Sequence, residues 1–422
     1  MTTRAGFAQA DITPPIGTRK IGWLLDIVSD HVIDPLHARV GVIDSGLDRI
    51  AFIGLDTLCV RWTHTREIRR RIESTYGFPG DRIMVAASHN HAGGAVANVG
   101  HVQRDEAYVE AVTQNVVRAF GEALASLRKV ELGFGSAFEW EVSANRRVVM
   151  RDGTVRTHGT FDTPEALCLE GPIDPEVAVL AARTPEGTPV GCIVNFACHP
   201  THHGGGTGLS AGFPGVLARE MRDDGWPVTV FLNGACGNVH TADPRKSGAD
   251  PGMEEAGKRV ARDVRAALAS TRFRKNVTLR SAGKRVDLPY RTITEDEIRS
   301  TTRGAQRLSD ATGVYDRLMP AAVRRVKERR SQPAEVQVLS IDEIDFVAIP
   351  AEYFVEHGLR IKEEAHPRRA VVVSCANGMV GYAPTRDAFK RGGYETTFTL
   401  SSRLAPEAGD ILADTAIALA RR

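Results

Sequence analysis

Residues Ala86–Gly94 read AASHNHAGG, and this stretch is the best starting point for the fold and function of the chain. It follows a short apolar run, Ile83-Met84-Val85, which predicts a buried strand. Two histidines two residues apart lie on the same side of an extended chain, and imidazole is a common metal ligand and proton shuttle. The two glycines allow a ligand to approach the backbone closely. The stretch therefore predicts the floor of an active site, the alternative being polar residues in an exposed loop.

The same pattern, an apolar strand followed by a polar loop rich in small residues, occurs again along the chain. A strand at 49–56 and a helix at 63–76 precede the first histidine pair, which is the order of a βαβ unit. Ligands bind at the carboxyl ends of strands in open α/β sheets. Two later strands end in similar loops, namely Val190–Phe196 before ACHPTHHGGG and Val228–Leu232 before NGACGNVH.

The second half of the chain continues this alternation and completes the predicted fold. Two strands lie within 336–349, and Pro350–Tyr353 opens a helix that extends to about Glu364. A further strand, Val371–Val373, and a closing helix, Pro406–Arg421, follow. We expect an α/β fold of several layers, with mixed sheets and flanking helices. Residues 1–422 are expected to form one domain, with 292–332 as an arginine-rich helical insertion.

The composition is ordinary for a globular protein and excludes several classes of function. The 422 residues are 42% hydrophobic and 25% charged, with a net charge of +2, so nothing indicates a nucleic-acid partner. No apolar run approaches the ~20 residues of a membrane helix, and the first residues lack the apolar core of a signal peptide. We expect a cytoplasmic protein without stable membrane association. Six scattered cysteines with no Cys-x-x-Cys pair are expected to be mostly small buried residues.

The polar residues at the strand ends suggest metal-dependent hydrolysis. Several neutral histidines with one carboxylate form the ligand set of a catalytic zinc that keeps a position open for water. Such an ion lowers the pKa of water and polarises a carbonyl, as cleavage of an amide or ester requires. The sequence has no His-Glu-x-x-His helix, no Gly-x-Ser-x-Gly elbow and no phosphate-binding P-loop. A thiol hydrolase that uses Cys198 or Cys236 remains an alternative.

Several segments together resemble the neutral, non-lysosomal ceramidases. The matching segments appear in the order of that family and span most of the chain: Ala10–Pro14, Ser88–His91, Asn195–Thr201, Gly234–Val239, Pro350–Glu352, Gly381-Tyr382 and Tyr394-Glu395. The resemblance implies a ceramidase-like catalytic domain with a zinc ion. Its expected ligands are His89, His199, Glu352 and Tyr382.

The resemblance also implies roles for residues around the metal. His91 is similar to a second, non-ligating histidine that stabilises the oxyanion or moves a proton, and Tyr394 is similar to a second pocket tyrosine. Arg146 is similar to an arginine that holds the substrate. We add Gly17, from the rigid turn after Asp11, and His202 as further candidates for contact with the substrate.

Four of these residues have plainer interpretations that the sequence leaves open. Glu352 is compatible with a solvated carboxylate in the first turn of a helix, and Tyr382 with core packing. Arg146 is compatible with a surface charge. His240 stands where the ceramidases have a serine, so it is either a catalytic group of the pocket or part of a polar turn.

These observations predict a zinc-dependent hydrolase of the amidase type. His202, His203 and the glycines after them suggest a polar pocket, so we expect a small soluble amide rather than ceramide as substrate. A lactonase or esterase on the same centre is the alternative, as is a ceramidase-like protein that binds metal without catalysis. A homo-oligomer is compatible with the sequence.

Overall fold

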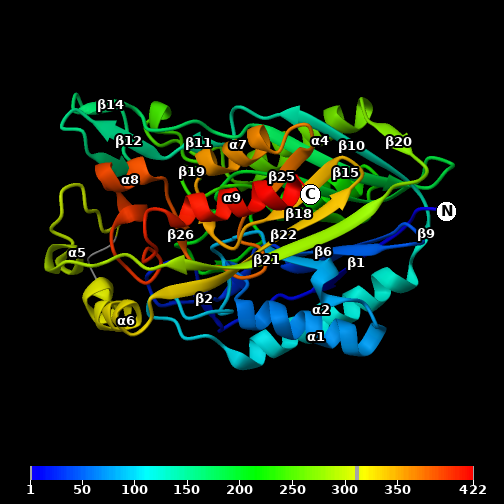
Figure 1. Ribbon diagram of the computed structural model, residues 1–422, viewed down its shortest axis with the longest axis horizontal. Helices are drawn as coiled ribbons and strands as arrows, with labels where there is room; N and C mark the ends of the chain where they lie inside the picture. Colours follow the sequence, from blue (N-terminus) through cyan, green and yellow to red (C-terminus); the bar gives the residue numbers. More distant parts are fainter. Residues whose placement is uncertain (1, 309–312, 422) are drawn as a thin grey trace.

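Three mixed β-sheets pack around a shared core in the computed structural model, which describes residues 2–308 and 313–421 (Figure 1). The strand orders are β7-β6-β5-β1-β9, β18-β16-β15-β10-β20 and β21-β22-β23-β25. The first sheet comprises β1 (Arg4–Asp11), β5 (His37–Asp44), β6 (Arg49–Leu55), β7 (Ile83–Ala87) and β9 (Arg128–Lys129). The second comprises β10 (Glu131–Phe138), β15 (Glu176–Arg183), β16 (Pro189–Phe196), β18 (Thr229–Asn233) and β20 (Arg272–Arg274). The third comprises β21 (Leu279–Pro289), β22 (Ser331–Ile341), β23 (Ile344–Ala348) and β25 (Arg369–Val373).

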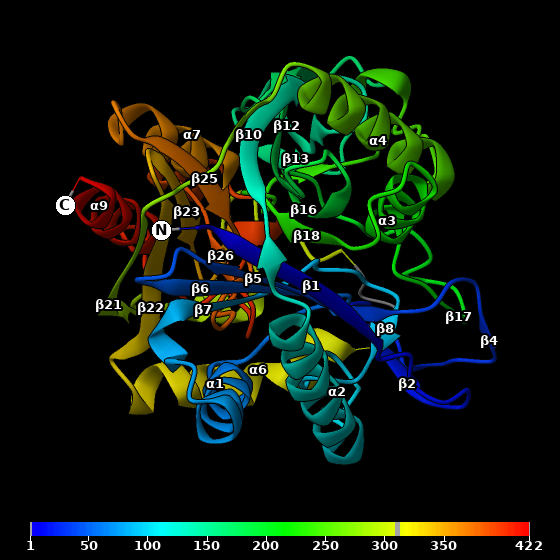
Figure 2. The ribbon, with the colours of Figure 1, turned by 90° about the vertical axis from the view of Figure 1, so that its right-hand side faces the viewer.

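A pair of helices covers the outer face of each sheet (Figure 2). The pairs are α1 (Trp62–Tyr76) with α2 (Glu106–Ala125), α3 (Phe213–Asp223) with α4 (Met253–Ala269), and α7 (Val355–Glu364) with α9 (Ala408–Ala420). This arrangement confirms the predicted α/β class, with mixed sheets in several layers and flanking helices.

Alternation along the strands builds both the inner and the outer cores. In β6, Phe52 points into the core that the three sheets share, while its neighbour Ile53 packs under α1 and α2. In β22, Leu339 faces inward and Val338 faces α9 in the same way. The rings of Phe52 and Phe346 lie 4.8 Å apart in an edge-to-face contact, which joins the first sheet to the third.

Each sheet contains one parallel pair of strands, and the carboxyl ends of the three pairs meet. The pairs are β6 with β7, β16 with β18, and β23 with β25. Asn233, the last residue of β18, joins them. Its side-chain amide donates to the carbonyls of Ser88 and Cys198, both at 2.9 Å. Its backbone carbonyl accepts from the backbone N–H of Ser374. The loops that carry the predicted site therefore start from one fixed point.

The region 292–332 contains two helices, α5 (Glu295–Arg299) and α6 (Val314–Glu328), which lie at one end of the molecule (Figure 1). Residues 309–312 of this region lie outside the described residues. The remaining elements are short: β2 (Arg19–Ile21), β3 (Ile27–Val28), β4 (His31–Val32), β8 (Gly93–Gly94), β11 (Ala144–Asn145), β12 (Arg147–Met150), β13 (Val155–Thr157), β14 (Ala166–Leu169), β17 (Gly208–Leu209), β19 (Val239–His240), β24 (Glu352–Tyr353), β26 (Tyr382–Ala383), α8 (Arg386–Arg391) and three 3-10 turns at Gly80–Arg82, Pro244–Lys246 and Tyr394–Thr396.

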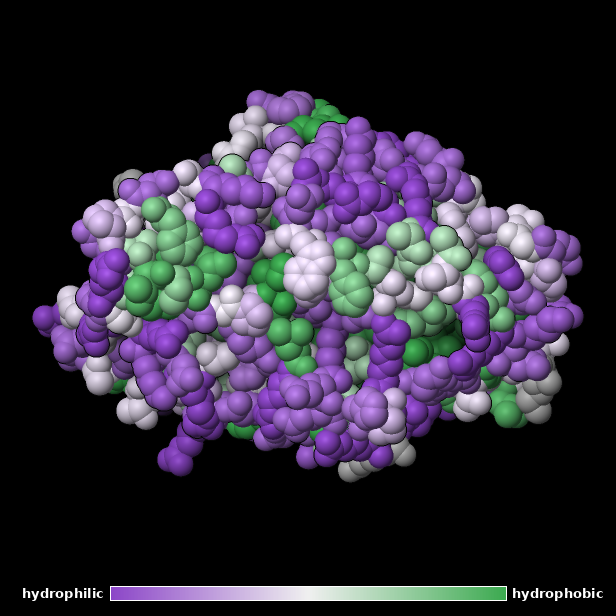
Figure 3. All heavy atoms as spheres, turned by 90° about the horizontal axis from the view of Figure 1, so that it is seen from above, coloured by the Kyte–Doolittle hydropathy of each residue, from purple (hydrophilic) through white to green (hydrophobic). Residues whose placement is uncertain are grey.

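One face of the molecule is largely hydrophilic, and its apolar groups form separate patches (Figure 3). Among the residues that the structure describes, no helix is both long and apolar enough to cross a membrane.

Replacement of Asn233 by alanine is expected to destabilise the fold. The change leaves the buried carbonyls of Ser88 and Cys198 without their donor, and each such loss costs about 1–3 kcal/mol. The free energy of unfolding, measured by urea denaturation, should fall by about 2–6 kcal/mol. Gln114→Ala, on the exposed face of α2, is the control and should leave it nearly unchanged. Equal stability of Asn233→Ala and the wild type would contradict a joining role for Asn233.

Candidate metal centre

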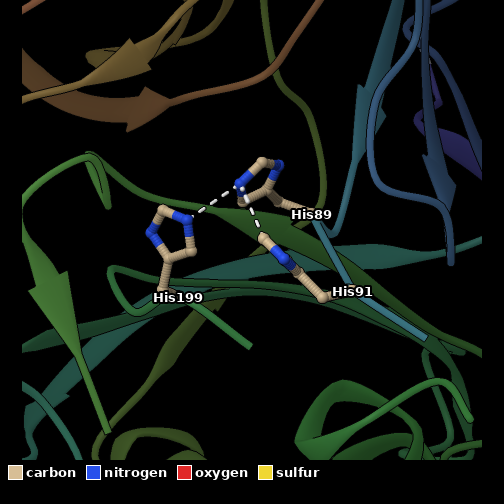
Figure 4. Close-up of side chains that lie close together, drawn as sticks. All are labelled: His89, His91 and His199. Carbon is tan, nitrogen blue, oxygen red and sulfur yellow. Dashed lines mark hydrogen bonds between the residues drawn. The ribbon is translucent and has the colours of Figure 1, made fainter. Parts of the chain in front are cut away.

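Three imidazoles, of which those of His89 and His199 are buried and that of His91 is half-buried, converge at the carboxyl ends of the strands (Figure 4). The Nε2 atom of His89 lies 2.9 Å from that of His199 and 3.3 Å from that of His91. His89 and His91 come from the loop after β7, and His199 comes from the loop after β16. These side chains could hold a metal ion.

The hydrogen-bond partner of Nδ1 determines which nitrogen of each ring carries the hydrogen. The Nδ1 atoms of His89, His91 and His199 lie 2.7, 2.6 and 2.8 Å from the backbone carbonyls of Leu58, Gly22 and Cys236, respectively. A carbonyl only accepts, so Nδ1 carries the hydrogen in each case, and a neutral ring then presents a bare lone pair at Nε2. When all three rings are neutral, three acceptors face one another with no donor between them, an arrangement that a cation stabilises.

The backbone around the first histidine pair differs from the extended chain that the sequence suggested. Strand β7 ends at Ala87, and His89 has a φ of +67°, in the left-handed region that residues other than glycine rarely adopt. The two rings meet because the chain turns at His89, so the argument from strand alternation is wrong. Gly22 lies against the ring of His91, and a Cβ atom there would be 2.7 Å from the Cα of His91. The left-handed backbone at His89 is a local strain of the kind that is typical of functional sites.

Glu352 brings a carboxylate to the three histidines. It lies in β24, which pairs with β26 so that Glu352 is opposite Tyr382. Its Oε2 atom is 3.4 Å from Nε2 of His89 and 3.7 Å from Nε2 of His199. The helix begins only at Val355, so the interpretation of Glu352 as a solvated residue of a first helical turn is wrong: the side chain is buried.

Burial and mutual charge set the protonation of these groups. Burial raises the pKa of Glu352, but His89 opposes it and lowers the pKa overall, so the carboxylate is ionised. Burial likewise lowers the pKa of His89, but Glu352 raises it overall. Burial, helped by His89, lowers the pKa of His91 to about 3, and burial lowers the pKa of His199 as well. Burial therefore favours the neutral forms of His91 and His199, whereas Glu352 favours a proton on His89, which a bound cation would displace.

A buried ion-pair network contacts the hydroxyl of Tyr382. Arg146 is buried rather than exposed, and its Nη2 atom lies 3.2 Å from the hydroxyl of Tyr382. Its Nε atom donates to Glu395 at 2.8 Å, and Arg147 donates to the other oxygen of Glu395 at 2.7 Å. Burial raises the pKa of Glu395, but the two arginines outweigh it and bring the pKa to about 2. Arg146 therefore positions Tyr382.

The cluster opens on a cavity of about 340 Å³. His89, His91, Glu352, Tyr382 and Tyr394 line one part of it, and the rings of the two tyrosines lie 5.8 Å apart. Apolar side chains line much of the remainder: Leu24, Leu58, Val99, Val314, Leu318, Met319, Ala322, Met379 and Leu400. The expectation of a polar pocket is therefore wrong for this cavity, because α6 closes it with apolar side chains and the glycine-rich loop after His199 does not line it.

The structure places the other predicted residues away from the cavity lining. His240 lies behind His199, with ring centroids 6.4 Å apart, and its Nε2 atom faces the hydroxyl of Thr201. His202 faces Asp250 at 3.0 Å, and Gly17 is exposed. Neither Cys198 nor Cys236 lines the cavity, and both are buried. Burial raises the pKa of the Cys198 thiol well above its usual value, which disfavours a thiolate nucleophile there.

Sequence reasoning missed the residues that support the cluster. The carbonyls of Leu58, Gly22 and Cys236 have no side-chain signature, and only the fold reveals them. Glu395 and Arg147 did have a signal, since each directly follows a residue that we had selected, Tyr394 and Arg146.

Comparison with known proteins identifies the fold. No protein-family model matches the chain, and no curated protein matches it. Among solved structures, neutral ceramidase from Pseudomonas aeruginosa is similar over 100% of this chain and 74% of its own, with 21% identity and a TM-score of 0.77. A ceramidase complexed with C2 is similar over 100% of this chain and 75% of its own, with 20% identity and a TM-score of 0.78. The chain therefore has a ceramidase-like fold, as the sequence motifs predicted.

Proposed function

We propose that this protein is a zinc-dependent hydrolase that cleaves the amide bond of a small molecule through an activated water. The observation that carries the proposal is the convergence of three Nε2 lone pairs and one carboxylate at the end of a cavity. Two ligands of a tetrahedral zinc with bonds of 2.0–2.1 Å lie about 3.3 Å apart. The Nε2 atoms of His89 and His199 and the Oε2 atom of Glu352 lie 2.9 to 3.7 Å from one another, which fits an ion of that size.

His89, His199, Glu352 and Tyr382 are the proposed ligands. Nitrogen ligands with one carboxylate favour zinc over magnesium or calcium, which prefer oxygen. Zinc in such a site supplies an activated water and polarises the carbonyl of a substrate. A purely structural zinc would be closed off by its protein ligands, with no position open for water. Here the cluster faces a cavity, which favours catalysis over metal binding alone.

The remaining polar groups of the cavity suit the movement of protons and the stabilisation of charge. His91 directs an Nε2 atom without a hydrogen at the cluster, because its Nδ1–H donates to the carbonyl of Gly22. It can accept a proton from the attacking water and deliver a proton to the leaving nitrogen as the C–N bond breaks. Tyr394 lines the same cavity and can donate its hydroxyl hydrogen to the developing oxyanion. An ester or lactone would use the same groups.

Metal content is the first test of the proposal. Wild-type protein should contain about one equivalent of zinc by elemental analysis, whereas His89→Ala and His199→Ala should lose both the metal and amidase activity, because each removes a ligand. His203→Ala, whose side chain is exposed, is the matched control and should keep both. Wild-type protein that binds no metal even after reconstitution would refute the proposal.

His91→Ala separates a proton-transfer role from a ligand role. A group that transfers protons should leave the zinc content intact while the rate constant falls by roughly 10²–10⁴. The measurement pairs elemental analysis with steady-state kinetics on one amide substrate. Full activity would exclude the catalytic role, and loss of zinc would make His91 a ligand instead.

A further inference from the structure

A second cavity, of about 650 Å³, adjoins the cavity of the metal cluster. The two cavities share part of their wall, so a ligand in one lies next to the other. The shared residues are Arg61, Asn98, Met379, Leu400 and Arg403.

The second cavity, which we call the arginine cavity, is strongly cationic. Six arginines and two glutamates line it: Arg61, Arg104, Arg324, Arg325, Arg329 and Arg403, with Glu328 and Glu335. Glu335 already pairs with Arg69 at 2.8 Å, outside this set. Among the arginines, Arg104 pairs with Glu106, but no other makes an ion pair with a carboxylate within residues 2–308 and 313–421. The positive charge of this cavity is therefore largely uncompensated.

The two arginines of the shared wall are bound only by neutral groups. Arg403 is 6% exposed, and its guanidinium contacts the carbonyl of Leu400 and the amide oxygen of Gln332, while its Nε atom is buried without a partner in the described structure. Arg61 donates to the carbonyl of Met379 at 3.0 Å. Burial lowers the pKa of Arg403; the Tyr290 hydroxyl opposes this shift, and Arg325 and Arg61 add to it by repulsion. A buried cation without a carboxylate is costly, and a bound anion would relieve that cost.

Helix α6 connects the two environments. Val314, Leu318, Met319 and Ala322 face the metal cavity, whereas Arg324 and Arg325 face the arginine cavity. A molecule that spans both would meet apolar side chains near the metal cluster and guanidinium groups beyond the shared wall.

We propose that the substrate is an amide with an apolar portion and an anionic group, a carboxylate or a phosphate. The apolar portion lies against α6 in the metal cavity, and the anion lies in the arginine cavity, where Arg61 and Arg403 determine specificity. Guanidinium groups bind both anions through paired hydrogen bonds. This inference rests on the proposed hydrolase function and narrows its substrate class.

Binding measurements on the whole protein test this inference without relying on turnover. Isothermal titration of metal-free protein would compare N-hexanoylglycine, its uncharged carboxamide, and the corresponding aminomethylphosphonate amide. A charge-assisted hydrogen bond contributes about 1.5–3 kcal/mol, so one or both anions should bind about 10- to 100-fold more tightly than the carboxamide. The tighter of the two anions identifies the carboxylate or the phosphate class. Equal affinity for all three ligands would overturn the proposal, as would inorganic phosphate alone binding as tightly as the best amide.

Variants of the shared wall show whether the arginines cause the preference. Arg61→Met and Arg403→Gln should each reduce the affinity for the anionic amide about 10-fold or more and leave that for the carboxamide unchanged. Arg403→Lys keeps the charge and tests whether a loss arises from misfolding, which thermal denaturation would also detect. Arg118→Ala, on the exposed side of α2, is the control. An anion preference that survives in both Arg61→Met and Arg403→Gln would overturn the assignment.

Hydrolysis of the same ligands by the zinc-loaded protein separates the two proposals. Cleavage of the anionic amide with a KM at least 10-fold below that of the carboxamide supports both. Tight, arginine-dependent binding without cleavage would retain the anion site and argue against the hydrolase. Cleavage of the acid and the carboxamide with equal KM values would retain the hydrolase and overturn the anion site.

Discussion

Asn233 holds the carboxyl ends of three sheets at one point through its side-chain amide and its backbone carbonyl, and the site depends on this constraint. Its two donated hydrogen bonds reach the backbone just before His89 and His199, and its own carbonyl accepts from the third sheet at Ser374. Strand ends from separate sheets have no ladder to fix their spacing. A buried residue that bonds to all three through its side chain and its backbone supplies a fixed spacing, because any shift leaves a buried carbonyl without a partner.

The histidine cluster follows from that constraint in combination with a second set of backbone contacts. Each ring is held by one carbonyl, and the carbonyls of Leu58 and Cys236 belong to the loops after β6 and β18. Ring orientation and tautomer are therefore set by strand ends rather than by other flexible side chains. Such carbonyl contacts on the second nitrogen are the usual means of orienting a ligating imidazole. The left-handed backbone at His89 is the local strain that this geometry requires.

Local patterns predicted the layers of the fold and the strand ends at which the polar residues gather. Apolar runs followed by small and polar residues identified β7, β16 and β18, and the carboxyl-end rule placed His89 and His199 together. The same reasoning failed where the decisive contact is distant in sequence. The pairing of Glu352 with Tyr382, for example, makes a short strand where the sequence suggested the first turn of a helix. The polar loop after His199 suggested a polar pocket because no local pattern indicates that α6, more than a hundred residues later, lines the cavity.

For the proposed hydrolase, the substrate class would depend on the cavity walls, which come from parts of the chain outside the metal cluster. A fold shared at 21% identity with a neutral ceramidase leaves those walls free to differ, and one fold commonly serves several substrates. His89 and His199 lie in loops that follow strands of the sheets. Arg61, by contrast, precedes α1, and Arg403 precedes α9. Changes at such connecting positions leave the sheets and the Asn233 contacts intact. A cationic wall beside an apolar one would therefore alter what is bound while the residues of the metal cluster stay in place.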